Sequence, residues 1–178
     1  MKADVAEMEA LITQRLKLER LRDGRALSFG MHDVAPILRA AAAPFEDAPP
    51  GVLVELPEGE LSARIDPERI LTVRGNLLEN AAKYALPESA PVVLSTAREA
   101  DGIVVRVRDD GPGLPEADRA TLFKPFTRVD RSRSKKTGGY GLGLAFCKRI
   151  VEAFGGDIAL EPPEGRGATF VVRLPAAG

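Results

Sequence analysis

The chain has 178 residues, of which 44% are hydrophobic and 29% charged, as is typical of a single globular domain. Its net charge of −1, from 25 basic and 26 acidic residues, argues against nucleic acid or a membrane surface as a general partner. One cysteine excludes an internal disulfide framework, and no apolar run approaches the roughly 20 residues that span a bilayer. Because the charged start also lacks a secretory signal, we expect a cytoplasmic polypeptide.

The first 22 residues carry an amphipathic pattern that predicts a long helix ending at Gly24. A helix of this length needs a partner to bury its apolar stripe. The helix either packs against its own domain or presents half of an interface whose other half is missing. The stripe recurs at spacings of three, four and seven and consists of Val5, Met8, Leu11, Ile12, Leu18 and Leu21.

The next part of the chain interleaves short strands with a helix. A Pro- and Ala-rich stretch, residues 35–51, leads into predicted strands at 52–56 and 61–65. Residues 66–86 then switch to a helical period, and an Asp-Pro pair supplies the N-cap and the first helical residue.

The sequence after residue 86 predicts a hairpin and then a helix followed by two strands. The hairpin strands, 92–96 and 103–109, flank the turn sequence EADG, and a Gly-Gly pair stops a helix over 142–154. The last strands cover 157–161 and 168–174. Because these elements lack the regular βαβ rhythm, the sequence predicts a two-layer α/β sandwich with an antiparallel or mixed sheet.

The helix over 66–86 carries the first candidate site, because Asn76, Asn80, Lys83 and Tyr84 fall within one narrow arc. Asparagine is a mediocre helix former, so two of them at i, i+4 suggest amides that bind something. Their neutral oxygens suit Mg²⁺ already held by phosphates, although the pattern alone also describes an exposed polar face. An adjacent, wider arc is apolar and contains Ile70, Leu71, Leu77, Leu78, Ala81 and Ala82.

The sequence DDGPGLP, residues 109–115, follows a predicted strand. Asp109 at the strand end can accept hydrogen bonds from an amino group, and Gly111 and Gly113 allow a ligand to approach the backbone closely. Taken alone, the same residues also describe an ordinary β-turn.

A cationic segment enters a glycine-rich loop before the helix over 142–154. Five of the nine residues 128–136 are basic and only Asp130 opposes them. Backbone N–H groups of such a loop, together with the positive end of the next helix, favour phosphate binding. The loop is not a Walker A motif, which requires Gly-Lys-Ser/Thr, and it lies too late in the chain for the first turn of a dinucleotide fold.

Four segments in this order, NLLENAAKY, DDGPGL, LFKPFTRVD and GGYGLGLAFCKRIVEAFGG, resemble the N, G1, F and G2 boxes of sensor histidine kinases. The resemblance covers residues 50–175. It implies the Bergerat-type ATP-binding sandwich of the GHKL superfamily, which gyrase-type ATPases and heat-shock chaperone ATPases share.

The resemblance implies a role for each candidate residue in binding ATP and Mg²⁺. Asn80 would ligate the metal, Asn76 and Lys83 would touch the phosphates, and Tyr84 would flank the adenine. Asp109 would accept the adenine amino group, with room for the base at Gly111 and Gly113. Arg128 and some of Arg131, Arg133, Lys135 and Lys136 would form a lid over the γ-phosphate. Gly139, Gly141 and Gly143 would be its hinge, and Leu142 and Leu144 beside them would also contact the nucleotide.

Departures from the family pattern refine this expectation. The hydrolytic relatives carry a water-activating Glu where this chain has Asn76. Glu79 does not replace it, because it points about 100° away from its neighbour Asn80 around the helix. Phosphoryl transfer assisted by Asn76, Lys83 and Arg128 is therefore favoured over hydrolysis. Tyr140 stands where relatives carry a smaller residue.

Sensor kinases phosphorylate a histidine on a dimeric helical hairpin. His32 lies where relatives have their first strand, so we interpret it as a strand or loop residue. We therefore expect residues 1–23 to be the end of the second hairpin helix and 24–178 to be the catalytic and ATP-binding domain, in a fragment that lacks the acceptor. The implied partners are that hairpin domain and a response regulator, and the implied parent is an inner-membrane sensor.

Two alternatives remain open at this level. An anti-sigma factor serine kinase shares the nucleotide fold and needs no internal His, and a nucleotide-binding module without catalysis would also carry these motifs. Elsewhere we expect Cys147 to be a buried core thiol, and Phe123 and Phe126 to anchor the base of the lid.

Overall fold

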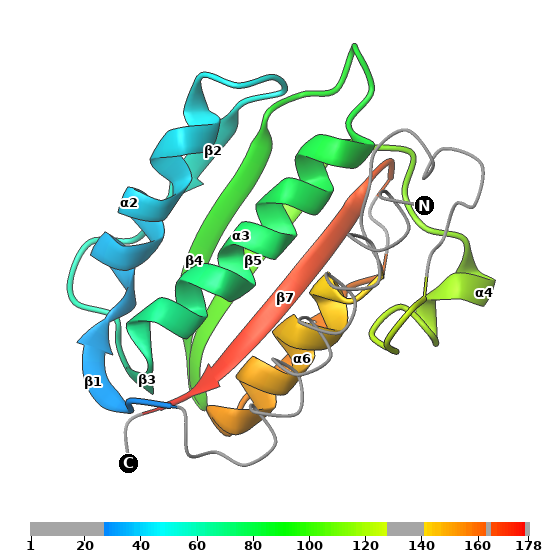
Figure 1. The fold of residues 1–178 in the computed structure, drawn as a ribbon. Coiled ribbons are helices and arrows are strands. Elements are labelled where there is room, and N and C mark those ends of the chain that lie inside the picture. The colour runs from blue at the N-terminus through cyan, green and yellow to red at the C-terminus, as the bar shows by residue number, and fades with distance from the viewer. Residues whose placement is uncertain (1–26, 128–140, 163–164, 177–178) are drawn as a thin grey trace, which may run out of the picture.

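The computed structural model describes residues 27–127, 141–162 and 165–176, which build a five-stranded sheet with a layer of helices on one face (Figure 1). The sheet order is β2 (Val52–Glu55), β4 (Val92–Glu99), β5 (Gly102–Asp109), β7 (Ala168–Pro175) and β6 (Asp157–Leu160). Strand β2 runs parallel to β4 and the other neighbours are antiparallel, so the sheet is mixed. The predicted two-layer α/β sandwich is confirmed.

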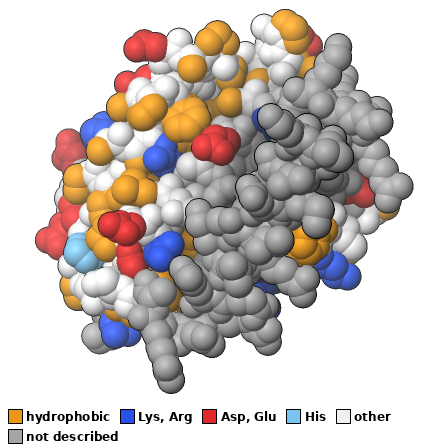
Figure 2. Space-filling model, viewed as in Figure 1, with side chains coloured by type: hydrophobic (Ala, Val, Ile, Leu, Met, Phe, Trp, Pro, Cys, Tyr) orange, Lys and Arg blue, Asp and Glu red, His pale blue; other side chains and the backbone are white. Residues whose placement is uncertain are grey.

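The helical layer consists of α2 (Val34–Glu46), α3 (Pro67–Tyr84) and α6 (Gly143–Ala153). A two-stranded sheet, β1 (Gly30–Asp33) with β3 (Ser62–Ile65), and the short helix α4 (Glu116–Arg119) complete the described elements. Within the described ranges no helix has the length and apolar character needed to cross a membrane. Figure 2 shows acidic and basic side chains intermixed over the described part of the helical face.

Helix α2 occupies the Pro- and Ala-rich stretch for which the sequence indicated no helix. The Asp33 side chain caps it by accepting a hydrogen bond from the Ala35 N–H at 3.1 Å. Its buried positions, Val34, Leu38, Ala41 and Ala42, follow a helical spacing, but two of the four are alanines. Small side chains give a weak amphipathic signal, so packing against neighbouring elements establishes this helix.

Helix α3 begins as the sequence predicts, because the Asp66 carboxylate accepts hydrogen bonds from the backbone N–H groups of Glu68 and Arg69 at 3.0 and 3.3 Å. Its apolar arc needs one correction: Leu71 is 38% exposed, whereas Val73 is buried. The helix packs against α2 on one side and α6 on the other, so the buried stripe is centred between them. The stripe contains Ile70, Val73, Leu77, Leu78 and Ala81.

Helix α6 ends where the glycine pair predicts. Gly155 adopts a φ of +77°, and the N–H groups of Gly155 and Gly156 close the last turn on the carbonyls of Glu152 and Val151. Cys147 is fully buried and its thiol faces the Val73 carbonyl at 3.6 Å. Burial raises the pKa of this thiol to about 12, which confirms the predicted core cysteine.

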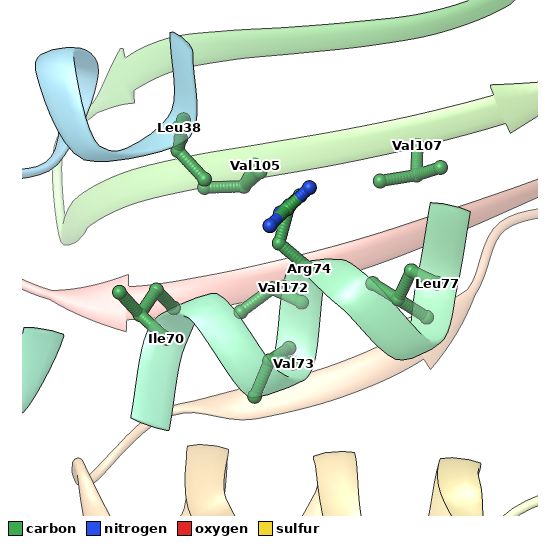
Figure 3. A pocket seen from close by; sticks show the side chains of 8 residues that line it. All are labelled: Leu38, Ile70, Val73, Arg74, Leu77, Val105, Val107 and Val172. Atoms are coloured by element: carbon green, nitrogen blue, oxygen red, sulfur yellow. The ribbon is translucent and has the colours of Figure 1, made fainter. Parts of the chain in front are cut away.

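One charged side chain reaches into the apolar layer between the helices and the sheet. The Arg74 guanidinium points into a cavity of about 10 Å³, with an otherwise apolar lining (Figure 3). Its Nε and Nη1 have no hydrogen-bond partner in the described part of the chain, and it lies 5.6 Å from the Phe45 ring centroid. Burial lowers the pKa of Arg74, and the nearby Glu79 charge partly opposes this effect. The lining comprises Leu38, Ile70, Val73, Arg74, Leu77, Val105, Val107 and Val172.

Candidate functional site

The structure brings the asparagine face of α3 to the first residue of α6. The Asn76 amide donates from Nδ2 to the Thr72 carbonyl at 2.9 Å. A Cβ built on Gly143 would lie only 2.6 Å from Asn76 Oδ1, so this contact leaves no room for a side chain at Gly143. Two motifs that are 67 residues apart in the sequence therefore meet at one point.

The start of α6 has no side-chain cap, because its N-cap residue is Leu142, and its first turn carries no acidic residue. Such an end keeps backbone N–H groups and a partial positive charge available for an anion. The Leu142 side chain is buried and the Leu144 side chain is half-buried against the core. Any ligand contact of Leu142 would therefore come from its backbone.

The other predicted residues of α3 follow along the same flank. Asn80 is half-buried one turn beyond Asn76, and the described part of the chain shows no hydrogen bond of its amide. The Lys83 ammonium lies 5.4 Å from the centroid of the Tyr84 ring, and Tyr84 is 38% exposed. The helix thus presents two amides, a cation and an aromatic ring in succession.

Asp109 ends β5 as a nearly buried carboxylate, 9% exposed. Its Oδ1 accepts hydrogen bonds from the N–H groups of Gly111 at 2.9 Å and Ala168 at 3.3 Å. Burial raises the pKa of Asp109, the two hydrogen bonds partly offset this, and the charge of Asp110 adds to it. Since both donors engage Oδ1, Oδ2 has no partner among the described residues and can accept from a ligand.

The loop after β5 packs against the end of α3. A Cβ on Gly111 would lie 2.9 Å from Asp109 Oδ1 and 3.1 Å from the Tyr84 carbonyl oxygen. Gly113 adopts a φ of +75°, and a Cβ there would lie 3.0 Å from the Gly167 carbonyl oxygen. The two predicted glycines therefore let three segments approach closely at the Asp109 carboxylate.

Sequence reasoning missed Gly167 and Ala168, which complete the surroundings of Asp109. A Cβ on Gly167 would overlap the Asp109 carbonyl oxygen, and Ala168 pairs with Asp109 across β5 and β7. The available signal was a pair of glycines, Gly165 and Gly167, immediately before the last strand. Only the strand register identifies their neighbour.

The base of the glycine-rich loop is anchored differently from the prediction. Phe123 packs edge-on against Phe170 with centroids 6.4 Å apart, which confirms it as an anchor. Phe126 was expected to anchor as well, but its side chain is 56% exposed and its φ is +63°. Its backbone makes the connection instead: the Phe126 N–H donates to the Gly141 carbonyl at 2.9 Å. A Cβ on Gly141 would lie 2.5 Å from the Thr127 carbonyl oxygen.

Several predicted site residues and the predicted first helix, 1–23, lie outside the described residues. The site residues are Arg128, Arg131, Arg133, Lys135, Lys136, Gly139 and Tyr140. Their roles, and the domain boundary at residue 24, stay predictions.

His32 lies in β1, opposite Ala63, as the interpretation of a strand residue requires. The adjacent Asp33 carboxylate accepts from the N–H groups of Ala35 and Leu61, so it serves the fold. Strand β1 pairs with β3, which precedes the N-terminal end of α3, whereas the candidate site lies along the C-terminal half of that helix.

The donor set fits a metal that is held mainly by its ligand. Among the described residues no group of three or more His, Cys, Asp or Glu side chains could hold a metal ion. The Asn80 carbonyl oxygen is a neutral donor that suits Mg²⁺ when phosphates supply the negative charge. The residues present therefore fit a magnesium–phosphate complex better than a free cation.

Comparison with known proteins agrees with this geometry. The model of the histidine kinase-, DNA gyrase B-, and HSP90-like ATPase family matches residues 65–178. The sensor histidine kinase WalK of Bacillus subtilis is 41% identical over 122 residues, which cover 67% of this chain and 20% of WalK. The bacteriophytochrome of Pseudomonas aeruginosa is 32% identical over 176 residues, which cover 97% of this chain and 24% of that protein. The chain thus spans a quarter or less of the length of these relatives.

Solved structures show the same fold. The histidine kinase domain of the Escherichia coli osmosensor EnvZ matches with a TM-score of 0.67 and 29% identity, over 87% of this chain and 93% of that domain. Full-length ShkA in complex with AMPPNP matches with a TM-score of 0.75 and 26% identity, over 97% of this chain and 37% of ShkA. The chain therefore belongs to the histidine kinase-, DNA gyrase B-, and HSP90-like ATPase family, as an ATP-binding domain of the sensor histidine kinase type.

Proposed function

We propose that this chain binds Mg²⁺-ATP and transfers the γ-phosphate to a histidine on a separate dimerisation hairpin. The observation that carries the proposal is the contact of Asn76 with Gly143, which aligns the amide face of α3 with the uncapped start of α6. Amide groups, a lysine and a helix N-terminus together suit a polyphosphate. The AMPPNP complex of the similar kinase ShkA supports an adenine nucleotide as the ligand.

At the phosphate end, Asn76 and Lys83 contact the phosphates and Asn80 ligates Mg²⁺ through its carbonyl oxygen. Bound there, Mg²⁺ neutralises phosphate charge and orients the γ-phosphoryl group. The backbone N–H groups at the start of α6 complete the cradle. In the same proposal the lid and its hinge would comprise Arg128, Arg133, Lys136, Gly139 and Gly141, of which only Gly141 is among the described residues.

At the base end, Asp109 accepts the adenine amino group on Oδ2, since backbone N–H groups already occupy Oδ1. Gly111 and Gly113 keep side chains away from the base, and the half-exposed Tyr84 ring flanks it. A buried carboxylate with one oriented free oxygen discriminates amino from carbonyl substituents.

The residues near the phosphates favour transfer over hydrolysis. The amide of Asn76 cannot accept a proton from water at neutral pH, and the only nearby acid on α3, Glu79, is exposed. Catalysis by Asn76, Lys83 and Arg128 then consists of positioning and charge neutralisation, as is usual in phosphoryl transfer.

The proposed acceptor histidine and the proposed partner proteins are not part of the described structure. Residues 1–23 would form the end of the second hairpin helix, the hairpin would carry the acceptor histidine, and a response regulator would take the phosphoryl group from it. The parent protein would be an inner-membrane sensor with this domain on the cytoplasmic side. The relatives named as sensor histidine kinases, such as WalK, support the kinase part of this proposal.

A transfer assay tests the proposal. The chain is incubated with γ-labelled ATP, alone and with the hairpin domain of its own parent. We expect no label on the chain and acid-labile, base-stable label on the hairpin. Asn80→Ala should abolish transfer, whereas Glu79→Gln, an exposed neighbour, should retain it. Label on serine of another protein would favour the serine-kinase alternative, and absence of ADP binding at millimolar nucleotide would refute nucleotide binding altogether.

A further inference from the structure

Three loops that belong to different motifs converge beside Asp109. They follow α3, follow β5 and precede β7, and all three lie at the end of the sheet where β5 finishes and β7 starts (Figure 1). The side chains that connect these loops belong to none of the candidate residues identified above.

Arg166 makes the central connection. Its guanidinium binds Asp110 bidentately, with Nε 3.0 Å from Oδ1 and Nη2 2.5 Å from Oδ2. Nη1 of Arg166 lies 3.6 Å from Glu88 Oε1 in the loop after α3. Asp110 Oδ2 also accepts a hydrogen bond from the Ala90 N–H at 3.0 Å. The two ion pairs of Arg166 and the hydrogen bond from Ala90 therefore connect all three loops.

Ser89 strengthens the same connection. Its hydroxyl donates to the Asp110 carbonyl oxygen at 2.8 Å and accepts from the Leu86 N–H at 2.9 Å. The hydrogen bonds from the Arg166 side chain and from the Ala90 N–H lower the pKa of Asp110 to about 2. The carboxylate is therefore ionised throughout the physiological range, and the pair does not act as a pH switch.

The pair lies next to both hydrogen bonds that orient Asp109. Asp110 directly follows Asp109 and precedes Gly111, which donates to Asp109 Oδ1. Arg166 lies two residues before Ala168, which donates to the same oxygen at 3.3 Å. Movement of either loop would release one donor and let the carboxylate rotate.

We propose that Arg166 is a positioning residue for base recognition: by pairing with Asp110 it holds the Asp109 carboxylate with Oδ2 facing the adenine amino group. This inference rests on the proposed nucleotide function and extends it to a residue outside the recognised motifs. Arg166 does not touch the nucleotide.

The expected effect is moderate, because an exposed ion pair contributes little by itself. The Arg166 and Asp110 side chains are 44% and 31% exposed. Bidentate geometry and the two backbone connections make this pair more specific than an isolated surface pair. We therefore expect the consequence in base selectivity and not in overall folding.

The test compares ADP with IDP, which carries a carbonyl where ADP carries the amino group, by titration calorimetry. Arg166→Ala should weaken ADP binding about fivefold to tenfold and leave IDP binding unchanged, so that the preference for ADP shrinks. Arg166→Lys should restore part of the preference. Arg149→Ala, which removes an arginine paired with Glu152 on α6, is the matched control and should behave like the unmodified chain.

A double-mutant cycle tests whether Arg166 affects ADP binding through Asp110. Arg166→Ala combined with Asp110→Asn should be no worse than the poorer single variant, because both changes break the same pair. Equal weakening of ADP and IDP, or an unchanged ADP preference in Arg166→Ala, would overturn the positioning role while the nucleotide function stands. Absence of ADP binding by the unmodified chain would instead overturn the proposed function and this inference with it.

Discussion

The two ends of the candidate nucleotide site are built in different ways. At the base end, the protein orients the candidate binding group itself: Asp109 is buried, and two backbone N–H groups hold one of its oxygens. At the phosphate end, the Asn80 amide has no hydrogen bond in the described part of the chain, and α6 begins without a side-chain cap. The ligand must supply the partners there.

The difference follows from what each end recognises. A neutral base offers few hydrogen bonds, so a binding group that is oriented before binding preserves selectivity. Phosphates carry enough charge to organise amides, N–H groups and a metal around themselves. Substitutions at the base end should therefore alter selectivity, and substitutions at the phosphate end should alter affinity for every nucleotide.

The largest expected effect comes from Gly143→Ala at the phosphate end. The new Cβ would lie 2.6 Å from Asn76 Oδ1 and must displace the Asn76 amide from its position at the phosphate end, which should weaken ADP and IDP alike by about 100-fold. Gly75→Ala is the matched control, because a Cβ at Gly75 meets no atom within 4 Å. Calorimetric titration of both variants checks the prediction, and selective loss of ADP binding would contradict it.

Asp109→Asn should produce the next largest effect, restricted to the base. The Gly111 and Ala168 N–H groups require an acceptor, so the amide oxygen must take their side and the NH₂ group must face the adenine amino group. We expect ADP to lose about 1–3 kcal/mol of binding free energy and its preference over GDP. Asp101→Asn, in an exposed turn, is the control. An unchanged preference would remove Asp109 from base recognition.

Acidification should also weaken ADP binding. Burial raises the pKa of Asp109 above the ordinary value of 3.8. Only the ionised carboxylate leaves Oδ2 free of a proton to accept from the amino group while Oδ1 accepts from the backbone N–H groups. ADP affinity should fall as the pH drops toward this raised pKa, and IDP affinity should not follow the same curve. Titrations between about pH 8 and about pH 5 test this, and parallel curves for the two nucleotides would contradict it.

The same group has the opposite effect on folding stability. Because the folded pKa lies above the unfolded one, the Asp109 carboxyl stabilises the fold below its unfolded pKa, and this contribution is lost as the pH rises through the folded pKa. The stability of Asp109→Asn relative to the unmodified chain should therefore be greater at neutral than at acidic pH. Thermal unfolding of both proteins at several pH values would show this.

The smallest effect is expected at Arg74, which lies outside both ends of the candidate nucleotide site. Arg74→Met replaces a guanidinium whose Nε and Nη1 are buried without partners by a side chain that suits the apolar lining. Unfolding in urea should show a gain of about 1 kcal/mol, with ADP and IDP affinities unchanged. Arg39→Met, which removes an exposed arginine from α2, is the control. A loss of stability in Arg74→Met would show that the guanidinium supports the fold.

The start of α3 and the end of α6 were predictable because neighbouring residues determine them. Asp66 accepts from N–H groups two and three residues ahead, and Gly155 reverses the chain with a positive φ. The shared face of Asn76, Asn80, Lys83 and Tyr84 follows from helical geometry alone. Helix α2 escaped prediction because half of its buried positions are alanines, whose burial depends on how closely other elements approach.

Local sequence encodes the N-cap of α3, the glycine pair that ends α6 and the spacing of the four motifs, since these depend on contacts within a few residues. The assembled fold adds that Asn76 meets Gly143, that Ala168 and Gly167 lie against Asp109, and that the Phe126 side chain faces solvent. These facts depend on strand register and on the packing of α3 against α6. No local pattern encodes such contacts, because their partners lie dozens of residues apart and meet only when the sheet and its helices assemble.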